Sequence, residues 1–320
     1  MRRFRMIALG ASTLALLVSA CSTGGGGSTS PSATASGSTA ASPAGKPTIK
    51  VGSANFPESQ IVAEIYAQAL EAKGFKVERH LNIGDRALTN DSLRAGAINL
   101  MPEYIGSDAR QVGAEATSDP AQTLTNLNAA LAKLDTPMIA LNYSPGADQN
   151  GFVVRKETAD QFSLKTVSDA AKIASQLRWG LPPECATNPS CGPALMSAYG
   201  IDITKVKEWK KLGPCSEPMA VALNTSVIDV AELCSTQADI VRFNFVLLED
   251  DKHSQSADNM APVLRKDTAD QGGTALADRL NAVSAKLTTD ILTKLGAQVS
   301  IDQKKIEDVA KQFLTDNGLL

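Results

Sequence analysis

The sequence has little of what most enzymes and nucleic-acid-binding proteins depend on. Its 320 residues include two histidines, His80 and His253, and its 31 basic residues are slightly outnumbered by 34 acidic ones. With so little histidine, acid–base chemistry near neutral pH falls to carboxylates. Because there is no basic excess and no basic stripe, we expect no nucleic acid partner.

The usual catalytic motifs are also absent from the sequence. It contains no nucleophile elbow, no HExxH zinc motif and no phosphate-binding loop, and its glycine run, Gly24 to Gly27, precedes no strand pattern. The neighbouring acids Asp250 and Asp251 are typical of a solvated turn. We therefore predict that the chain is not an enzyme and needs no cofactor. The rival hypothesis is an exported enzyme, which turnover of a bound solute would favour.

No apolar run is long enough to span a bilayer comfortably. The longest, from Met6 to Val18, follows the basic head Arg2, Arg3 and Arg5, and small residues then lead into Cys21. This order predicts a secretory signal over residues 1–20. The segment Val18-Ser19-Ala20-Cys21 resembles the lipobox of bacterial lipoproteins, which implies lipidation of Cys21. An ordinary signal peptide with a chance cysteine is the alternative.

The stretch after Cys21 carries no charge and no large apolar residue as far as Gly45. Such a composition cannot bury enough surface to offset the entropy lost on ordering. We predict a disordered tether over residues 21–47. The protein is then expected outside the cytoplasm, lipid-anchored to the outer face of the bacterial cytoplasmic membrane.

Four further cysteines are consistent with export. Cys185, Cys191, Cys215 and Cys234 allow three pairings as two disulfides. We favour Cys185–Cys191 and Cys215–Cys234, because each pair closes a local loop. A metal site is the rival interpretation, but the spacing lacks Cys-x-x-Cys and both histidines are distant in sequence. No metal is therefore expected.

Strand and helix patterns alternate along the body of the chain. The first half predicts strands at 49–51, 77–83 and 98–100. A helix capped by Asn55, with Glu58 as the acid of a capping box, and a helix from 84 to 96 lie between them. The alternation resumes from Phe152 and leads to a mostly helical tail over 276–319. This order predicts an α/β fold with parallel sheets, two lobes, and ligands beyond the carboxyl ends of strands.

Several segments, in order, resemble the glycine betaine/choline (osmoprotectant) binding proteins of ABC importers. These segments are Ile49 to Phe56 leading into Glu64 to Gly74, Pro102-Glu103-Tyr104-Ile105-Gly106-Ser107, Pro182-Pro183-Glu184 with Tyr199-Gly200-Ile201, and Leu248 to His253 with Asn259, Ala261 and Pro262. Any one segment is weak evidence, whereas the ordered set covers nearly the whole body.

The resemblance implies a two-lobed periplasmic-binding-protein fold with two hinge crossovers. Lobe 1 would combine residues 48–143 and 245–320, and lobe 2 would be 144–244. The implied function is to capture a small osmoprotectant-type solute by lobe closure and to deliver it to a permease that works with an ATPase. We expect a monomer.

The family's site for a quaternary ammonium group is a cage of tyrosines, and this chain departs from it. Tyr104 matches one cage position, and Ser107 stands where threonine is common in the family. Asn150, Cys234 and Asp258 align with the other three cage positions. Ala54 and Asn188 align with two cations that hold the betaine carboxylate. The chain has only four tyrosines and two tryptophans, of which Tyr66, Tyr199, Trp179 and Trp209 are expected in the core.

Polar and charged groups are therefore expected to replace the rings. Asp258 would neutralise a cation, whereas Asp148, Asn150, Ser107 and Ser59 would supply hydrogen bonds.

Two further residues complete the expected site. Arg86 would hold a carboxylate or stack on a ring, unless it forms a solvated pair with Asp85. Asn55, beside the first strand, is included among the ligand-binding candidates. The ligand itself stays open between a quaternary ammonium compound and a hydroxylated or aromatic solute, and so does the role, between transport and sensing.

Overall fold

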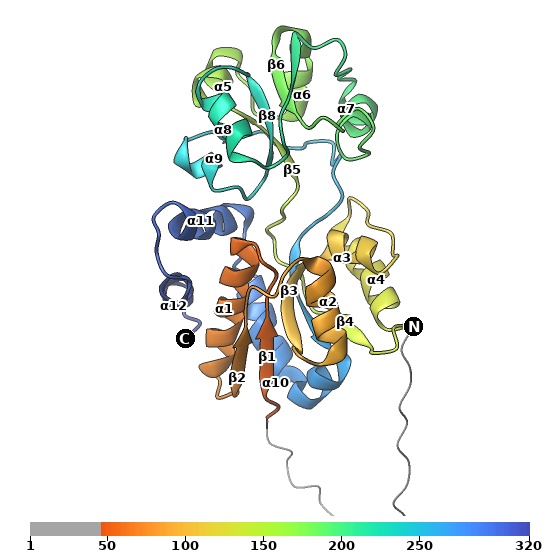
Figure 1. The fold of residues 1–320 in the computed structure, drawn as a ribbon, viewed down its shortest axis with the longest axis vertical. Coiled ribbons are helices and arrows are strands. Elements are labelled where there is room, and N and C mark those ends of the chain that lie inside the picture. The colour runs from red at the N-terminus through yellow and green to blue at the C-terminus, as the bar shows by residue number, and fades with distance from the viewer. Residues whose placement is uncertain (1–45) are drawn as a thin grey trace, which may run out of the picture. The chain divides into compact units, whose positions relative to one another are not determined.

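The computed structural model describes residues 46–320, which form two five-stranded sheets with helices on both faces (Figure 1). The predicted signal, Cys21 and nearly all of the predicted tether lie outside the described residues. We call the elements that pack on the first sheet lobe 1 and those that pack on the second sheet lobe 2. No helix of the described residues is both long enough and apolar enough to cross a membrane.

The sheet of lobe 1 has the order β2-β1-β3-β10-β4. Its strands are β1 (Ile49–Gly52), β2 (Val77–His80), β3 (Leu100–Tyr104), β4 (Met138–Ala140) and β10 (Met260–Arg265). Strand β1 is parallel to β2 and β3, whereas β10 runs antiparallel to β3 and β4. The expected parallel pattern is thus correct for the first three strands and wrong for the sheet as a whole, because β10 enters from a distant part of the chain.

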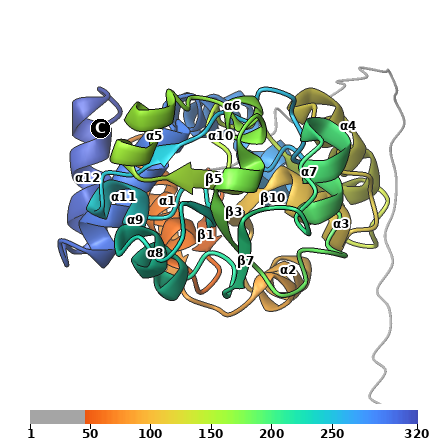
Figure 2. The ribbon, with the colours of Figure 1, turned by 90° about the horizontal axis from the view of Figure 1, so that it is seen from above.

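Helices cover both faces of this sheet. They are α1 (Pro57–Glu71), α2 (Arg86–Ala95), α3 (Ile105–Gln111), α4 (Pro120–Leu131), α10 (Lys266–Ser284), α11 (Thr289–Ser300) and α12 (Ile306–Asp316). Apolar residues of α1, α10, α11 and α12 form one core, with Tyr66 fully buried in it, and those of α2, α3 and α4 form another. Figure 1 and Figure 2 show α11 and α12 at the side opposite to α3 and α4.

The sheet of lobe 2 has the order β7-β6-β8-β5-β9. Its strands are β5 (Asn150–Val154), β6 (Arg178–Leu181), β7 (Glu208–Lys211), β8 (Val230–Cys234) and β9 (Val246–Leu247). Here too the sheet is mixed, since β5 runs antiparallel to β8 and β9. The pairing of β9 with β5 places residues 246–247 in this sheet and not in lobe 1, where the boundary at residue 245 had put them.

Lobe 2 also has helices on both faces. They are α5 (Lys156–Phe162), α6 (Val167–Ala171), the short 3-10 helix η1 (Ala174–Gln176), α7 (Gly192–Tyr199), α8 (Glu217–Asn224) and α9 (Asp239–Arg242). Trp179 and Tyr199 are buried in the core under α5, α6 and α7, whereas Trp209 is only partly buried beside it. The sequence reasoning missed α8, whose Pro218 it did not recognise as a first-turn residue.

The first helix begins differently from the expectation. Its N-cap is Phe56, whose side chain makes no capping hydrogen bond, and Pro57 occupies the first helical position. Asn55 is exposed and lies one residue too early, so the predicted Asn55 cap and its capping box are wrong. This shift of one residue leaves the Glu58 side chain available for other contacts.

Both favoured disulfides are confirmed. Cys185 pairs with Cys191, and Cys215 pairs with Cys234. The first pair is fully buried inside lobe 2, and the second is partly exposed. The two disulfides therefore stabilise different surroundings, a closed core and an open surface.

Candidate functional site

A cavity of about 640 Å³ is lined by residues of both lobes. Lobe 1 contributes the residues that follow the carboxyl ends of β1 and β3, the start of α2 and the end of α11. Lobe 2 contributes the end of β8, the Cys215–Cys234 disulfide and helix α9. Helices α9 and α11 lie against each other at one side, as Figure 1 shows. Ligands in α/β folds collect beyond the carboxyl ends of strands, which is where this cavity lies.

Two aromatic rings form one wall of the cavity. Phe56 follows β1 and Tyr104 ends β3, and because these strands are parallel neighbours their rings meet. The ring centroids are 6.0 Å apart and the planes are 18° from parallel, so the rings are stacked. They are the aromatic residues that line the cavity among the described residues. The pair therefore offers one aromatic platform and not a cage.

Glu58 lies beside this platform, in the first turn of α1. The Tyr104 hydroxyl donates a hydrogen bond to its carboxylate. Burial, and then the nearby charge of Asp148, raise the pKa of Glu58 to about 7, although hydrogen bonds from Tyr104 and Thr236 oppose the rise. The group is therefore divided between its acid and its carboxylate at neutral pH.

Asp148 faces the same space from the loop before β5. Its Oδ1 accepts a hydrogen bond of 3.2 Å from the backbone N–H of Thr236, which lies just after β8. Burial raises the pKa of Asp148, and the charge of Asp258 adds to the rise. Two carboxyl groups thus lie close together on one side of the cavity without a cation between them among the described residues.

Asp258, Ser107 and Arg110 form a connected group at the edge of the cavity. The backbone N–H and the hydroxyl of Ser107 each donate a hydrogen bond of 2.7 Å to Asp258. The guanidinium of the exposed Arg110 lies 3.1 Å from the same carboxylate. Asp258 therefore lines the cavity, and its carboxylate already has an exposed guanidinium as a partner.

Arg86, the first residue of α2, also lines the cavity. Its Nε and Nη2 donate to the two carboxylate oxygens of the buried Glu103, at 3.0 and 3.1 Å. Asp85 instead caps α2 by accepting from the Leu88 N–H. Arg86 is therefore positioned by Glu103 on β3 and not by its sequence neighbour, and its Nη1 has no acceptor among the described residues.

A smaller cavity of about 250 Å³ adjoins the first, since Ser107, Asp148, Cys234 and Asp258 line both. Asn150, at the start of β5, lies in this second space, and its side-chain amide donates to the Ser190 carbonyl at 3.3 Å. The structure thus brings six of the eight predicted ligand residues to the walls of these two neighbouring cavities: Arg86, Tyr104, Ser107, Asp148, Asn150 and Asp258.

Ser59 and Asn55 lie elsewhere. Ser59 is buried inside the start of α1, where its hydroxyl accepts the backbone N–H of Ala54 at 3.0 Å. Asn55 is exposed, and its backbone N–H is bound by the Gly84 carbonyl. Neither is among the described residues that line the two cavities. In this structure both hold the loop after β1 in shape.

The sequence reasoning missed three parts of the cavity wall. Glu58 was assigned to helix capping, Phe56 was not considered as a ring, and Thr236 was treated only as a neighbour of Cys234. Their common signal is position, because all three follow the carboxyl end of a strand. The wall formed by α9 and α11 carries no such signal, since only the folded chain brings these helices together.

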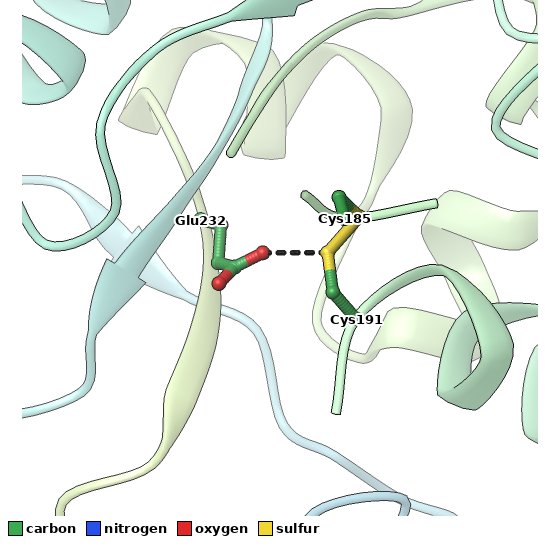
Figure 3. A group of neighbouring side chains, drawn as sticks. All are labelled: Cys185, Cys191 and Glu232. Carbon is green, nitrogen blue, oxygen red and sulfur yellow. Dashed lines mark hydrogen bonds between the residues drawn. A yellow bond between two sulfur atoms is a disulfide. The ribbon is translucent and has the colours of Figure 1, made fainter. Parts of the chain in front are cut away.

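A second group of side chains has the residue types and spacing of a metal site, but its chemistry does not suit a metal ion. Cys185, Cys191 and Glu232 have their sulfur and carboxylate atoms within 4.8 Å of one another. Figure 3 shows Glu232 facing the disulfide that joins the two cysteines, with Oε2 at 2.8 Å from the Cys191 sulfur. A disulfide has no thiolate to offer a metal, and no hydrogen to donate. The hydrogen bond across this contact therefore requires the protonated carboxyl group of Glu232 as donor.

The sequence of this chain is similar to those of known substrate-binding proteins. Residues 47–316 match the family of substrate-binding domains of ABC-type glycine betaine transport systems. The carnitine transport binding protein OpuCC of Listeria monocytogenes is 29% identical over 283 residues, which are 85% of this chain and 88% of that protein. The glycine-betaine-binding protein of Pseudomonas aeruginosa is 23% identical over 285 residues, 85% of this chain and 89% of that protein.

Solved structures share the fold. A crystal structure of a glycine betaine/carnitine/choline ABC transporter protein superposes with a TM-score of 0.77 at 23% identity, covering 85% of this chain and 99% of that one. The ligand-free YehZ structure from Escherichia coli gives a TM-score of 0.76 at 21% identity, covering 85% and 99%. The two-lobed periplasmic-binding-protein fold expected from the sequence is confirmed.

Proposed function

Because the chain belongs to the family of substrate-binding domains of ABC-type glycine betaine transport systems, we propose that it is the extracytoplasmic receptor of an importer for small osmoprotectant solutes. The solute would belong to the class of glycine betaine, carnitine and choline, the names carried by its relatives. It would be captured without chemical change. The lobes would close on it and present it to the permease, which works with an ATPase subunit.

The cavity between the lobes is the observation that carries this proposal. A volume of about 640 Å³ suits a small solute, and its wall comes from two sheets that only short crossovers connect. Five acidic and two basic side chains line it: Glu58, Asp148, Glu217, Asp239 and Asp258, with Arg86 and Arg242. The acidic excess favours a cationic group on the ligand.

The two ends of a zwitterionic solute have separate partners in this cavity. The Phe56–Tyr104 platform and the carboxylates of Glu58 and Asp148 would hold the cation. The unoccupied Nη1 of Arg86 would bind a carboxylate or hydroxyl group at the other end. Ser107, Asn150 and Asp258 would supply further polar contacts at the edge.

The proposed attachment and assembly rest on the sequence pattern around Cys21. A lipid on this cysteine, followed by an uncharged tether, would keep the receptor at the outer face of the cytoplasmic membrane. The crossovers that lead into β5 and out of β9 would act as the hinge. We propose that the receptor binds its solute as a monomer.

Titration calorimetry with glycine betaine, carnitine and choline tests the function, with sorbitol as the control ligand. We expect at least one of the three to bind with a Kd below 1 mM, that is, about −4 kcal/mol or better. Tyr104→Leu, which removes a ring and the hydrogen bond to Glu58, should weaken this binding, whereas Tyr143→Leu, which alters a partly buried tyrosine in the other core of lobe 1, should not. If none of the three releases heat and a polyol does, the solute class is wrong.

A further inference from the structure

The charges around the cavity are paired in a way that leaves two acids without a cation. Arg86 is bound to Glu103, and Arg110 to Asp258. Arg242 lies 3.0 Å from Glu217 and 3.5 Å from Asp239. These pairs account for each basic side chain that borders the space among the described residues.

Glu58 and Asp148 take part in no ion pair of the described residues. Their hydrogen-bond donors are neutral: Tyr104 and Thr236 donate to Glu58, and Thr236 and Ser235 donate to Asp148. A carboxylate has two oxygens and about four lone-pair positions. Both groups therefore retain the capacity to accept hydrogen bonds from a ligand in the cavity that both line.

The aromatic contribution beside them is small. A quaternary ammonium group carries no N–H and is held best when ring faces surround it. Here Phe56 and Tyr104 are stacked on each other, so together they present one surface. Cys234 and Asp258 line the cavity without a ring to offer. A methylated cation would desolvate two carboxylates and return no hydrogen bond to them.

We propose that Glu58 and Asp148 bind the cationic end of the ligand as hydrogen-bond acceptors, so that the site prefers a protonated amine bearing N–H over its quaternary counterpart. This inference rests on the proposed function and sharpens the class of solute. Charge-assisted hydrogen bonds to carboxylates are the stronger kind, and they need an N–H donor. The preference would separate this receptor from one built around a ring cage.

The ionisation of the two acids in the empty cavity agrees with such a role. Burial raises the pKa of both, and each also faces a further acid, Asp148 in the case of Glu58 and Asp258 in the case of Asp148. Tyr104, Thr236 and Ser235 are the hydrogen-bonding groups that face them, and none is cationic. A ligand cation placed between the acids would lower both pKa values and so favour the carboxylate form of each.

Matched pairs of ligands test the preference directly. Full-length protein is titrated at pH 7 with choline against N,N-dimethylethanolamine, and with glycine betaine against N,N-dimethylglycine. Each pair differs by one methyl group in place of one N–H. We expect the N–H member of each pair to bind at least tenfold more tightly. Repeating the titrations in buffers of different ionisation heat should show proton release with the N–H member.

Two variants assign the preference to the named groups. Glu58→Gln and Asp148→Asn should each reduce the ratio within a pair to less than threefold. Glu157→Gln is the matched control, because Glu157 occupies the same first-turn position of α5, is exposed and lies far from the cavity wall. It should leave the tenfold ratio intact.

The possible outcomes distinguish failure of this inference from failure of the proposed function. If the quaternary member of either pair binds as tightly as its partner or more tightly, the inference is wrong and the receptor function stands. If Glu58→Gln and Asp148→Asn both keep the tenfold ratio, these acids are not its source. If neither member of any pair binds to the folded wild-type protein, the proposed solute class fails as well. The wild-type comparison decides the preference even where a variant does not fold.

Discussion

The cavity and the interior of lobe 2 each combine a disulfide with a carboxyl group whose pKa burial raises to about 7. In the cavity these are Cys215–Cys234 and Glu58, and in the interior they are Cys185–Cys191 and Glu232. The second cause also matches, since a nearby acid adds to the rise in both cases: Asp148 for Glu58 and Glu184 for Glu232.

The difference is what can reach each group. Glu58 borders a space open to a solute, whereas Glu232 is 1% exposed and faces a fully buried disulfide (Figure 3). A cation that enters the cavity can compensate the charge of Glu58. Only a proton can compensate Glu232. The same cost of burying a carboxylate is thus coupled to binding in one region and to stability alone in the other.

Removal of a disulfide should give the largest changes in stability, and the buried pair separates stability from binding. Cys185→Ala with Cys191→Ala should lower the free energy of unfolding by about 3 kcal/mol, since loop closure is lost and two fully buried sulfurs disappear. Chemical denaturation measures this loss. Ligand affinity of the folded fraction should stay within twofold.

The matching change in the cavity wall tests the contrast. Cys215→Ala with Cys234→Ala also releases a loop that a disulfide closes. The free energy of unfolding should therefore again fall by about 3 kcal/mol. Because this pair lines the cavity, ligand affinity should fall as well. Equal effects of the two double variants on affinity would show that the distinction between the regions is wrong.

The next largest effect should come from Glu232→Gln. The folded-state pKa of Glu232, about 7, lies above its ordinary value of 4.5, so the folded protein binds more protons than the unfolded chain between these values. The stability that this carboxyl group contributes is therefore fully present below pH 4.5 and is lost as the pH rises through 7. Glutamine has no charge to bury. The variant should be more stable than wild type at pH 8 by about 2 kcal/mol, and equal to it or less stable at pH 4.5.

Denaturation curves at pH 4.5, 6 and 8 measure this slope. Glu232→Gln should leave ligand affinity unchanged, because the group lies outside the two cavities. A variant that is less stable than wild type at pH 8 would mean that the carboxylate is stabilised in the fold by something other than its proton.

Much of the fold follows from the sequence because short strands and capped helices are local. Ile49 and Val51 are buried on either side of the half-buried Lys50, and Asp85 and Gly96 bound α2 as expected. Strand β10 was not predicted, and its antiparallel direction depends on contacts with β3 and β4 more than a hundred residues away. Residue spacing along the chain does not show that this distant segment joins the sheet of lobe 1.

The site was predictable where a residue type is unusual for its place. Tyr104 and Asp258 stand at positions that the family resemblance marks, and both line the cavity. Ser59 was predicted to line the site, but its hydroxyl accepts a hydrogen bond from the backbone of the loop after β1. The sequence does not distinguish this use from ligand binding. Glu58 was missed because the helix starts one residue later than the cap pattern predicted.

Glu58→Gln should have a smaller effect on stability than Glu232→Gln and a larger effect on binding. Glu58 is only partly buried at the cavity surface, so the gain at pH 8 without ligand should be about 1 kcal/mol. With N,N-dimethylethanolamine at saturating concentration the order should reverse, because wild type gains more from binding. Thermal unfolding with and without this ligand measures both. A variant that is stabilised equally by the ligand would contradict a role of Glu58 in binding.

The smallest effect should come from Phe56→Leu, which removes half of the aromatic platform. Stacked aromatic pairs contribute about 0.5 to 1.5 kcal/mol beyond the area that they bury. The loss of binding free energy at this partly exposed position should therefore be under about 1 kcal/mol. Phe162→Leu is the control, since Phe162 is an exposed ring in α5 away from the cavity. If carboxylates and not rings select the cation, Phe56→Leu should weaken both members of a ligand pair by the same factor of about two to five. A selective loss of the quaternary member would show that the rings discriminate, and would move the source of specificity from the acids to the platform.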